Sequence, residues 1–372
     1  MRALGIILAG GNNNRMRELS NRRAIAAMPV AGSYRSIDFA LSNMTNSHIA
    51  KVAVLTQYNA RSLNEHLSSS KWWNFGRKQG GLFVFTPTIT PDNSFWYQGT
   101  ADAIYQNLDF LKRSHEPYVV IASGDCVYKL DYNKVLEYHI AKRADVTIVC
   151  KDVDANEDVT RFGVLRMNED YRIEEFEEKP MISDYHTIST GIYVIRRRQL
   201  IEMIERCAQE GRHDFVKDIL IRYKNLKRIY GYKIQDYWNN ISTVESYYKT
   251  NMDFLKPEVR DYFFRQYPEI NSKIDDLPPA KYNPGCLVKN SLVSSGCIIN
   301  GQVENSVLFK KVYVGNNCVI KNSIILNDVY LGDNTHIENC IVESRDTIRA
   351  NSYYCGEGEI KVVVEKNERY AL

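Results

Sequence analysis

The chain has 372 residues, which exceeds the usual size of one domain and predicts two, each with its own core. Its 48 Lys and Arg residues nearly balance 45 Asp and Glu residues, and this balance argues against a nucleic-acid-binding surface. No apolar run reaches the roughly 18 residues of a membrane-spanning helix. The eight cysteines include no C-x-x-C pair. We therefore expect a cytoplasmic protein with reduced thiols that binds neither nucleic acid nor membrane.

Residues 1–255 alternate short apolar strands with longer amphipathic stretches, which is typical of a mostly parallel, Rossmann-like sheet covered by helices. The predicted strands include residues 5–8, 51–55, 118–121 and 146–149. A glycine turn follows the first strand, and Ser123-Gly124-Asp125 follows the third. Because ligands of such sheets bind at the carboxyl ends of the strands, we expect these two turns to lie near one cleft.

A connector and a repetitive segment follow this first domain. Five prolines between positions 257 and 284 indicate the connector, which we place at residues 256–283. An apolar residue then recurs every six positions, with one step of five before Leu331. The series is Leu308, Val314, Ile320, Leu326, Leu331 and Ile337. This period predicts a left-handed parallel β-helix of hexapeptide repeats over residues 284–372, and an antiparallel sheet with frequent turns is the alternative. Open strand edges at the ends of a β-helix favour assembly with further copies.

The loop after the first strand has the composition of a phosphate-binding turn. Gly10 and Gly11 would let backbone N–H groups approach phosphate oxygens, and Arg15 would add charge-assisted hydrogen bonds. Taken alone, two glycines and an arginine after a strand are better explained as a plain turn. Other segments along the chain decide between the two interpretations.

These segments occur in the order seen in glucose-1-phosphate adenylyltransferases, and the chain resembles that family over nearly its whole length. The matching segments are Gly10-Gly11-x-x-x-Arg15, Asn21-Arg22-Arg23-Ala24, Tyr34-Arg35-x-Ile37-Asp38-Phe39, Thr56-Gln57-Tyr58, Trp96-Tyr97-x-Gly99-Thr100-Ala101-Asp102, Ser123-Gly124-Asp125, Phe162-Gly163-Val164, Glu178-Lys179-Pro180, Gly191-Ile192-Tyr193, His213-Asp214-Phe215, Tyr237-Trp238 and Leu277-Pro278-Pro279-Ala280-Lys281. The resemblance implies that glucose-1-phosphate attacks the α-phosphorus of ATP, which gives ADP-glucose and pyrophosphate. It also implies a Mg²⁺ ion held by two aspartates, since carboxylates suit this cation.

Several positions depart from the family pattern on the nucleotide and metal side. Asp125 and Arg15 are the catalytic residues that remain, and Asp125 is the first metal ligand. Asn240 stands where the family has its second aspartate, and Ile25 stands where it has a lysine. In the nucleotide loop, after Gly10 and Gly11, Asn12 begins a run of three asparagines where the family has glycines, and Gln98 replaces an arginine. We therefore expect Mg²⁺ binding to be weak or absent.

The sugar-phosphate side matches the family more closely. The resemblance assigns Lys179 to the phosphate of glucose-1-phosphate, Glu178 and Ser189 to the glucose hydroxyls, and Tyr97 and Gly99 to substrate binding as well. Without the surrounding matches, Glu178-Lys179 would be explained as a solvated pair at the end of a charged strand.

Three further positions match residues that regulate the family. Gln57 and Trp96 match loop residues that couple activator binding to catalysis. Ser33 stands in place of an activator-binding lysine, which weakens any inherited activator site.

This pattern is similar to the D-type regulatory subunit that accompanies a catalytic subunit in glycogen biosynthesis. We expect a catalytically poor pseudoenzyme that binds a sugar phosphate and forms a heterotetramer with the catalytic glucose-1-phosphate adenylyltransferase subunit. The alternatives are an active adenylyltransferase, a sugar-phosphate sensor without a catalytic partner, and a hexapeptide acyltransferase. The last is disfavoured because His336 is the only histidine of the repeats.

Overall fold

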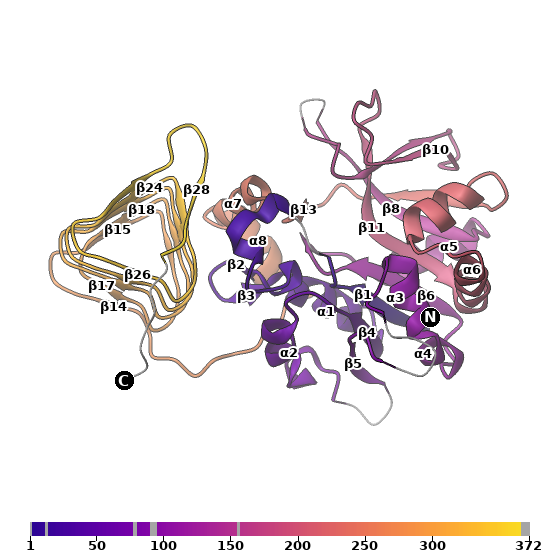
Figure 1. Ribbon diagram of the computed structural model, residues 1–372, viewed down its shortest axis with the longest axis horizontal. Coiled ribbons are helices and arrows are strands. Elements are labelled where there is room, and N and C mark those ends of the chain that lie inside the picture. Colours follow the sequence, from indigo (N-terminus) through magenta and orange to yellow (C-terminus); the bar gives the residue numbers. More distant parts are fainter. Residues whose placement is uncertain (1, 12–13, 77–79, 90–94, 155–156, 366–372) are drawn as a thin grey trace.

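The structure is a computed structural model that describes residues 2–11, 14–76, 80–89, 95–154 and 157–365. It shows an N-terminal α/β part and a C-terminal β-helix that lies beside it (Figure 1). The expected fold class is therefore confirmed. None of the helices among these residues has the length and apolar character needed to cross a membrane. All eight cysteines are free thiols, and six of them are buried.

The α/β part is built on one nine-stranded sheet. Its strands run in the order β10-β9-β11-β6-β1-β4-β5, with β8 beside β11 and β12 beside β8. The strands of this part are β1 (Ala3–Leu8), β2 (Pro29–Val30), β3 (Tyr34–Arg35), β4 (Lys51–Leu55), β5 (Gly81–Phe85), β6 (Tyr118–Ser123), β7 (Cys126–Tyr128), β8 (Val146–Asp152), β9 (Gly163–Met167), β10 (Ile173–Glu178), β11 (Thr187–Arg196), β12 (Ile229–Lys233) and β13 (Trp238–Asn240). The four predicted strands are confirmed as β1, β4, β6 and β8. The centre of the sheet is parallel, whereas β9, β10 and β11 add antiparallel pairs.

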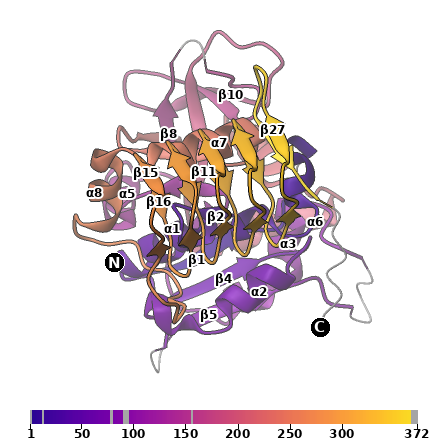
Figure 2. The ribbon, with the colours of Figure 1, turned by 90° about the vertical axis from the view of Figure 1, so that its left-hand side faces the viewer.

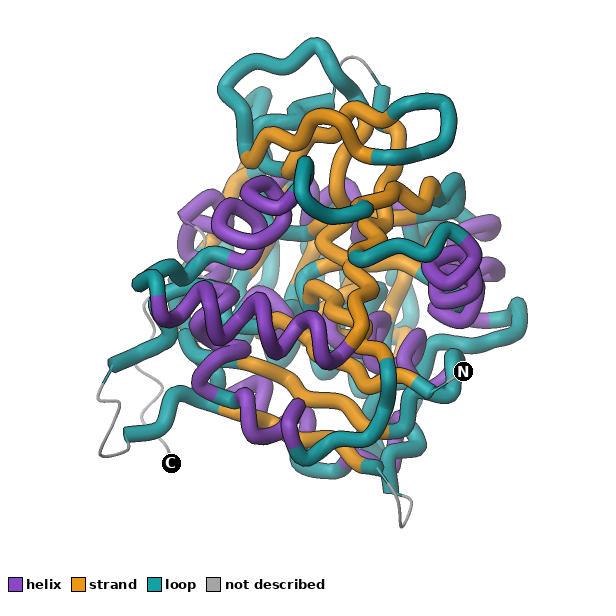
Figure 3. Tube along the Cα trace, turned by 90° about the vertical axis from the view of Figure 1, so that its right-hand side faces the viewer, coloured by secondary structure: helices purple, strands orange, loops and turns teal. Residues whose placement is uncertain are grey.

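Helices cover both faces of this sheet (Figure 3). The helices are α1 (Ser36–Asn46), α2 (Arg61–Leu67), α3 (Thr100–Gln106), α4 (Leu108–Lys112), α5 (Tyr132–Ala141), α6 (Arg197–Gln209), α7 (Val244–Asp253) and α8 (Pro257–Phe264), with short helical turns η1 (Asn14–Ser20), η2 (Ile25–Ala27), η3 (Ser70–Trp73) and η4 (Val216–Ile221). Successive residues of β1 point to opposite faces. Ile7 packs in the cluster that includes α1 and α5, and Ile6 packs in the cluster that includes α3 and α6. Burial on both sides explains why this strand is a continuous apolar run.

The β-helix consists of parallel strands stacked in three five-stranded sheets, consistent with a left-handed β-helix. Figure 2 shows the stack in front of the α/β part. Its strands are β14 (Lys281–Tyr282), β15 (Leu287–Lys289), β16 (Leu292–Val293), β17 (Ile298–Ile299), β18 (Gln302–Glu304), β19 (Val307–Leu308), β20 (Tyr313–Val314), β21 (Val319–Lys321), β22 (Ile324–Ile325), β23 (Tyr330–Leu331), β24 (His336–Glu338), β25 (Cys340–Val342), β26 (Thr347–Ile348), β27 (Tyr353–Cys355) and β28 (Lys361–Val363).

Asparagine turns lie above one another at the same corner of successive coils, each between two consecutive strands. Asn317, Asn334 and Asn351 all have left-handed backbone conformations, with φ of 54°, 59° and 59°. Asparagine tolerates this conformation better than other residues with a side chain. Their amides form a ladder, with hydrogen bonds of 3.1 Å and 3.0 Å between residues 17 positions apart. The coils that carry this ladder therefore have 17 residues, which explains why one step of the apolar period there is five residues rather than six. An earlier coil, from Leu292 to its partner Val307, has 15 residues.

The predicted apolar series is wrong at one position. Ile325, rather than Leu326, points into the coil, where it pairs with Leu308 and Val342. Leu326 lies outside the coil and packs against the α/β part. The five-residue step therefore falls between Ile320 and Ile325. Ile325 and Leu326 are both apolar because both are buried, Ile325 inside the coil and Leu326 in the cluster shared with the α/β part.

One sheet of the β-helix packs against the α/β part through a shared apolar cluster. The β-helix contributes Val307, Phe309, Ile324, Leu326 and Ile341, and the α/β part contributes residues such as Phe39, Tyr247, Phe254 and Phe263. Polar contacts reinforce this interface. The nearly buried Arg23 forms an ion pair with the buried Glu343 and donates to the Ser344 hydroxyl at 3.2 Å. The interface therefore links η2 and its neighbours directly to the β-helix.

Candidate active site

The two turns predicted to share a site lie side by side. Leu8 pairs with Ser123 at the ends of β1 and β6, and the Gly124 N–H donates to the Leu8 carbonyl at 2.9 Å. A Cβ on Gly124 would lie 3.1 Å from the Ala26 Cβ, which favours glycine there. The parallel pairing of adjacent strands therefore brings the glycine turn to the Ser-Gly-Asp turn.

The predicted nucleotide loop is described only in part. Gly10 lies beside Gln57, since a Cβ on this glycine would be 3.6 Å from the Gln57 Cβ. Gly11 is exposed, and Asn12 lies outside the described residues. Arg15 is an exposed residue of η1. Hydrogen bonds from Thr160 chiefly lower the pKa of Asp158, and the charge of Arg15 contributes to the same shift. Arg15 is therefore close enough to Asp158 for the two charges to interact.

Asp125 and Asn240, the two predicted metal positions, are neighbours. Strand β13 pairs antiparallel with β7, which places Asn240 opposite Cys126. The Ile241 N–H donates to the Asp125 carbonyl at 2.9 Å. The sequence separates these residues by more than a hundred positions, and this short two-stranded sheet brings them together.

These two residues do not fit a site with two carboxylate ligands. The Asn240 Oδ1 accepts a hydrogen bond from the Ser242 N–H at 3.0 Å and another from the Ser242 hydroxyl. Its amide group donates to the Cys126 Sγ at 3.6 Å. The described residues contain no group of three or more His, Cys, Asp or Glu side chains arranged to hold a metal. The pair therefore offers one carboxylate to a cation, that of Asp125, instead of two.

Ile25, the position where the family has a lysine, is buried in the apolar cluster shared by the two parts. Its side chain is 5% exposed and belongs to the same cluster as Met16, Val127 and Ile241. Val127 and Ile241 directly follow Cys126 and Asn240 in the chain. An isoleucine here therefore packs in the apolar cluster and supplies no charge to the Asp125–Asn240 pair.

The predicted sugar-phosphate residues come from β10 and β11. Glu178 ends β10, and its carboxylate lies 3.5 Å from the Lys179 Nζ. Burial raises the pKa of Glu178, and the charge of Lys179 opposes this effect. Ser189 is buried on β11, where its hydroxyl lies 3.4 Å from the Tyr193 hydroxyl. A Cβ on Gly191 would lie 3.3 Å from the Ser123 Cβ, so this strand also borders the Ser-Gly-Asp turn.

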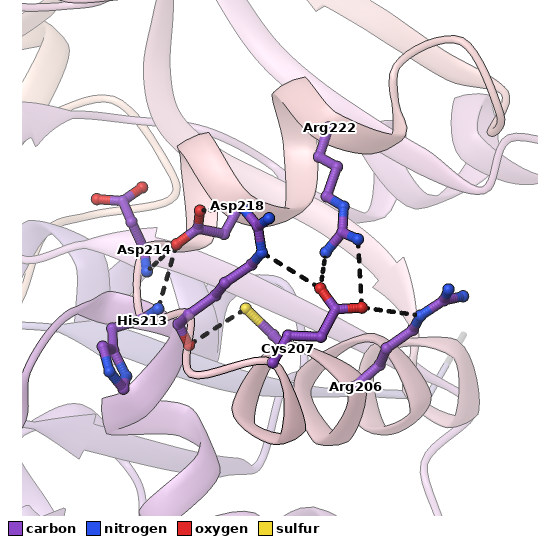
Figure 4. A network of polar contacts seen from close by, with 8 residues as sticks. Arg206, Cys207, His213, Asp214, Asp218 and Arg222 are labelled. Carbon is purple, nitrogen blue, oxygen red and sulfur yellow. Dashed lines mark hydrogen bonds and ion pairs between the residues drawn. The ribbon is translucent and has the colours of Figure 1, made fainter.

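The segment His213-Asp214-Phe215 links Gly99 to the same region. A Cβ on Gly99 would lie 2.3 Å from the His213 carbonyl oxygen, so the backbones approach too closely for any other residue. The same carbonyl accepts a hydrogen bond from Ala101 at the start of α3. Asp218 holds the segment by accepting from the His213 and Asp214 N–H groups at 3.1 Å and 2.9 Å (Figure 4). Arg212 pairs with Asp218 and with Glu210, and Arg206 and Arg222 also donate to Glu210.

Gln57, Trp96 and Tyr97 form a contact between two loops. The Tyr97 N–H donates to the Gln57 side-chain oxygen at 2.7 Å, and the Gln57 amide donates to the Tyr97 carbonyl at 3.2 Å. The exposed ring of Trp96 stacks on Tyr58, with centroids 6.0 Å apart. Because Gln57 also touches Gly10, this contact connects the Trp96 loop with the predicted nucleotide loop.

Ser33 lies away from these residues, in the wall of a cavity of about 910 Å³ between the α/β part and the β-helix. The cavity carries more cationic than acidic side chains. The cationic ones are Arg22, Arg23, Arg35, Arg61, Lys273, Lys310, Lys311 and Arg345, and the acidic ones are Glu65, Asp275, Asp276 and Asp328. Such an excess of positive charge around a cavity suits an anionic ligand.

Sequence reasoning assigned no role to three residues of this region. Burial chiefly raises the pKa of Tyr193, and the charges of Glu178 and Asp214 add to the shift, which places Tyr193 and Asp214 beside the sugar-phosphate residues. Arg161 lies over the Phe162 ring at 4.8 Å, and Phe162 contacts Trp238. Tyr193 and Asp214 occur in segments that match the family, so the resemblance could have identified them as site residues. Arg161 lies outside the matching segments, and nothing in the sequence pointed to it.

Two family models match the chain. Residues 4–257 match the model described as "Nucleotidyl transferase", and residues 278–357 match "GlmU-like, C-terminal hexapeptide". The fold, the paired turns and these matches define a nucleotidyltransferase-type protein with a hexapeptide-repeat domain.

Proteins named glucose-1-phosphate adenylyltransferase are similar over most of their length. The protein of Clostridium acetobutylicum is 41% identical over 320 residues, which cover 85% of this chain and 84% of the relative. That of Clostridium novyi is 39% identical with the same shares. That of Thermosipho melanesiensis is 39% identical over 319 residues, 85% of this chain and 77% of the relative. The chain therefore belongs to the glucose-1-phosphate adenylyltransferase family.

Proposed function

We propose that this chain is a regulatory, catalytically poor subunit of glucose-1-phosphate adenylyltransferase that acts in the cytoplasm by assembling with a catalytic homologue. The observation that carries this proposal is Asn240. It replaces a carboxylate next to Asp125, and its only oxygen is already occupied by Ser242. A preorganised charged group at such a position is typically worth about 10²–10³ in rate.

The cavity lined by Ser33 supports a regulatory role. It lies at the interface of the two parts, and its walls come from both of them. An anionic effector bound there would contact the η2 region and the β-helix together. Because Arg23 touches both the cavity and Glu343, ligand binding would change the contacts that fix the β-helix.

Assembly is tested by co-expressing the untagged chain with an affinity-tagged catalytic homologue. The two chains are expected to co-purify and to elute in size-exclusion chromatography as one species of heterotetramer size. Separate elution at all concentrations would favour the alternative of a sugar-phosphate sensor without a partner. Both chains are used without substitutions at Ser33 or the other cavity residues, so that the test reports assembly of the intact chain.

The chain is expected to bind a sugar phosphate more tightly than a nucleotide. In calorimetry, the isolated chain should bind glucose-1-phosphate more tightly than ATP, and Lys179→Ala should weaken sugar-phosphate binding about tenfold or more, because a charge-assisted hydrogen bond is lost. Lys134→Ala, at an exposed position of α5, is the matched control and should have no effect. Tight binding of Mg-ATP without binding of glucose-1-phosphate would reverse this assignment and favour an active nucleotide site.

A further inference from the structure

The Asp125–Asn240 pair is held by a continuous series of hydrogen bonds within the protein. The Asp125 Oδ1 accepts from the Ser123 hydroxyl and, at 3.5 Å, from the Cys126 thiol. Two donors therefore already stabilise the negative charge of this carboxylate. Both come from residues within two positions of Asp125 in the chain, so the local backbone fixes where they lie.

The orientation of the Asn240 amide follows from Ser242. A backbone N–H can only donate, so the Asn240 atom 3.0 Å from the Ser242 N must be the oxygen. The Ser242 hydroxyl donates to the same oxygen. The NH₂ group of Asn240 is then the part of the side chain that contacts the Cys126 Sγ, at 3.6 Å.

Cys126 connects the two sides. Its thiol donates to Asp125 and accepts from Asn240, and it is buried, with 1% exposure. The positive ends of an N–H and an S–H bond therefore lie between the two positions. A cation in this place would meet an N–H group instead of an oxygen, and it would have to break the contacts of Cys126 and Ser242 to gain ligands.

We propose that this cluster of Ser123, Asp125, Cys126, Asn240 and Ser242 takes the place of a divalent cation, and that Ser242 is the positioning residue that keeps the Asn240 amide donating to Cys126, which in turn donates to Asp125. The chain then binds its sugar phosphate without a metal. This last step rests on the proposed function, whereas the absence of cation binding at the cluster does not.

The test uses Mn²⁺ alone as the probe, with electron paramagnetic resonance to measure free and bound ion on the full chain. The wild-type protein should bind no Mn²⁺ at this cluster. Asn240→Asp replaces the NH₂ group with an oxygen beside Asp125, and it should bind Mn²⁺ at least about tenfold more tightly. Ser242→Ala removes the hydroxyl donor to the Asn240 oxygen and keeps the backbone N–H donor, so it should loosen the amide and give weaker Mn²⁺ binding than Asn240→Asp but more than the wild type.

Two controls make the series decisive. Asp125→Asn in the Asn240→Asp background should remove the new binding, which identifies the site. Asn240 and Ser242 are both partly exposed, so substitutions there should leave the fold intact. Thermal melting of each variant is the second control and verifies this. Wild-type binding as tight as that of Asn240→Asp would overturn the proposal. Equal binding by Ser242→Ala and wild type would overturn the role of the Ser242 hydroxyl.

The metal independence of ligand binding is measured separately. Calorimetry with glucose-1-phosphate should give the same dissociation constant, within about twofold, in Mg²⁺ and in EDTA. A loss of binding in EDTA alone would overturn the metal-independent step. Failure to bind in both conditions would refute the proposed sugar-phosphate site, while the Mn²⁺ series would still decide whether the cluster excludes a cation.

Discussion

Leu326→Asp is expected to lower the free energy of unfolding of the chain by about 3 kcal/mol or more. Leu326 is fully buried in the apolar cluster between the α/β part and the β-helix, where it contributes to the same core as Phe254 and Phe263. A carboxylate at this position would lose the burial of the leucine and would lie without a partner in an apolar environment. Urea denaturation, followed by circular dichroism, measures the change.

Tyr330→Asp provides the matched control four residues further along the same coil. Tyr330 is 42% exposed on another sheet of the β-helix and stacks on Tyr313 with centroids 4.7 Å apart. Its replacement should cost only the aromatic pair, about 0.5–1.5 kcal/mol. Equal destabilisation of the two variants would mean that burial of Leu326 in the cluster adds little to stability. The β-helix would then be stable without its contact to the α/β part, and the cluster would not join the two into one folding unit.

The architecture could be predicted because its signals are local. Each central strand is a continuous apolar run, since both of its faces are covered, and the repeat of the β-helix shows directly in the sequence. The phase of that repeat could not be predicted. Ile325 and Leu326 are both apolar, and only the packing of one β-helix sheet against the α/β part shows which of the two points into the coil.

The site could be predicted as a set of positions but not as a set of contacts. The neighbouring turns after β1 and β6 follow from the rule that ligands gather at the carboxyl ends of parallel strands. The contact of Asn240 with Cys126 depends on the pairing of β7 with β13, two strands of three residues each that carry no apolar period. The burial of Ile25 likewise depends on residues distant in the sequence.

The isolated chain is expected to make little or no ADP-glucose, and Asn240→Asp is expected to raise its rate by about 10²-fold, the typical worth of one preorganised electrostatic group. Adding Gln98→Arg should raise the rate further, because it adds a positive charge that can stabilise the negative charge developing on the phosphates. Gln98 is exposed, so the larger arginine side chain should be accommodated without disturbing the fold. Ile25→Lys is left out, since it would place an ammonium group in the apolar cluster and destabilise the fold.

Steady-state release of pyrophosphate measures these rates, first for each chain alone and then after mixing with the catalytic homologue. Gln98→Arg alone is the control, and it should remain as inactive as the wild type because Asn240 is unchanged. Effects of groups that act on the same developing charge are not additive, so the double variant is compared with both single ones. Rapid ADP-glucose synthesis by the unmutated chain without a partner would show that Asn240 does not disable the site, and the chain would then be a catalytic subunit.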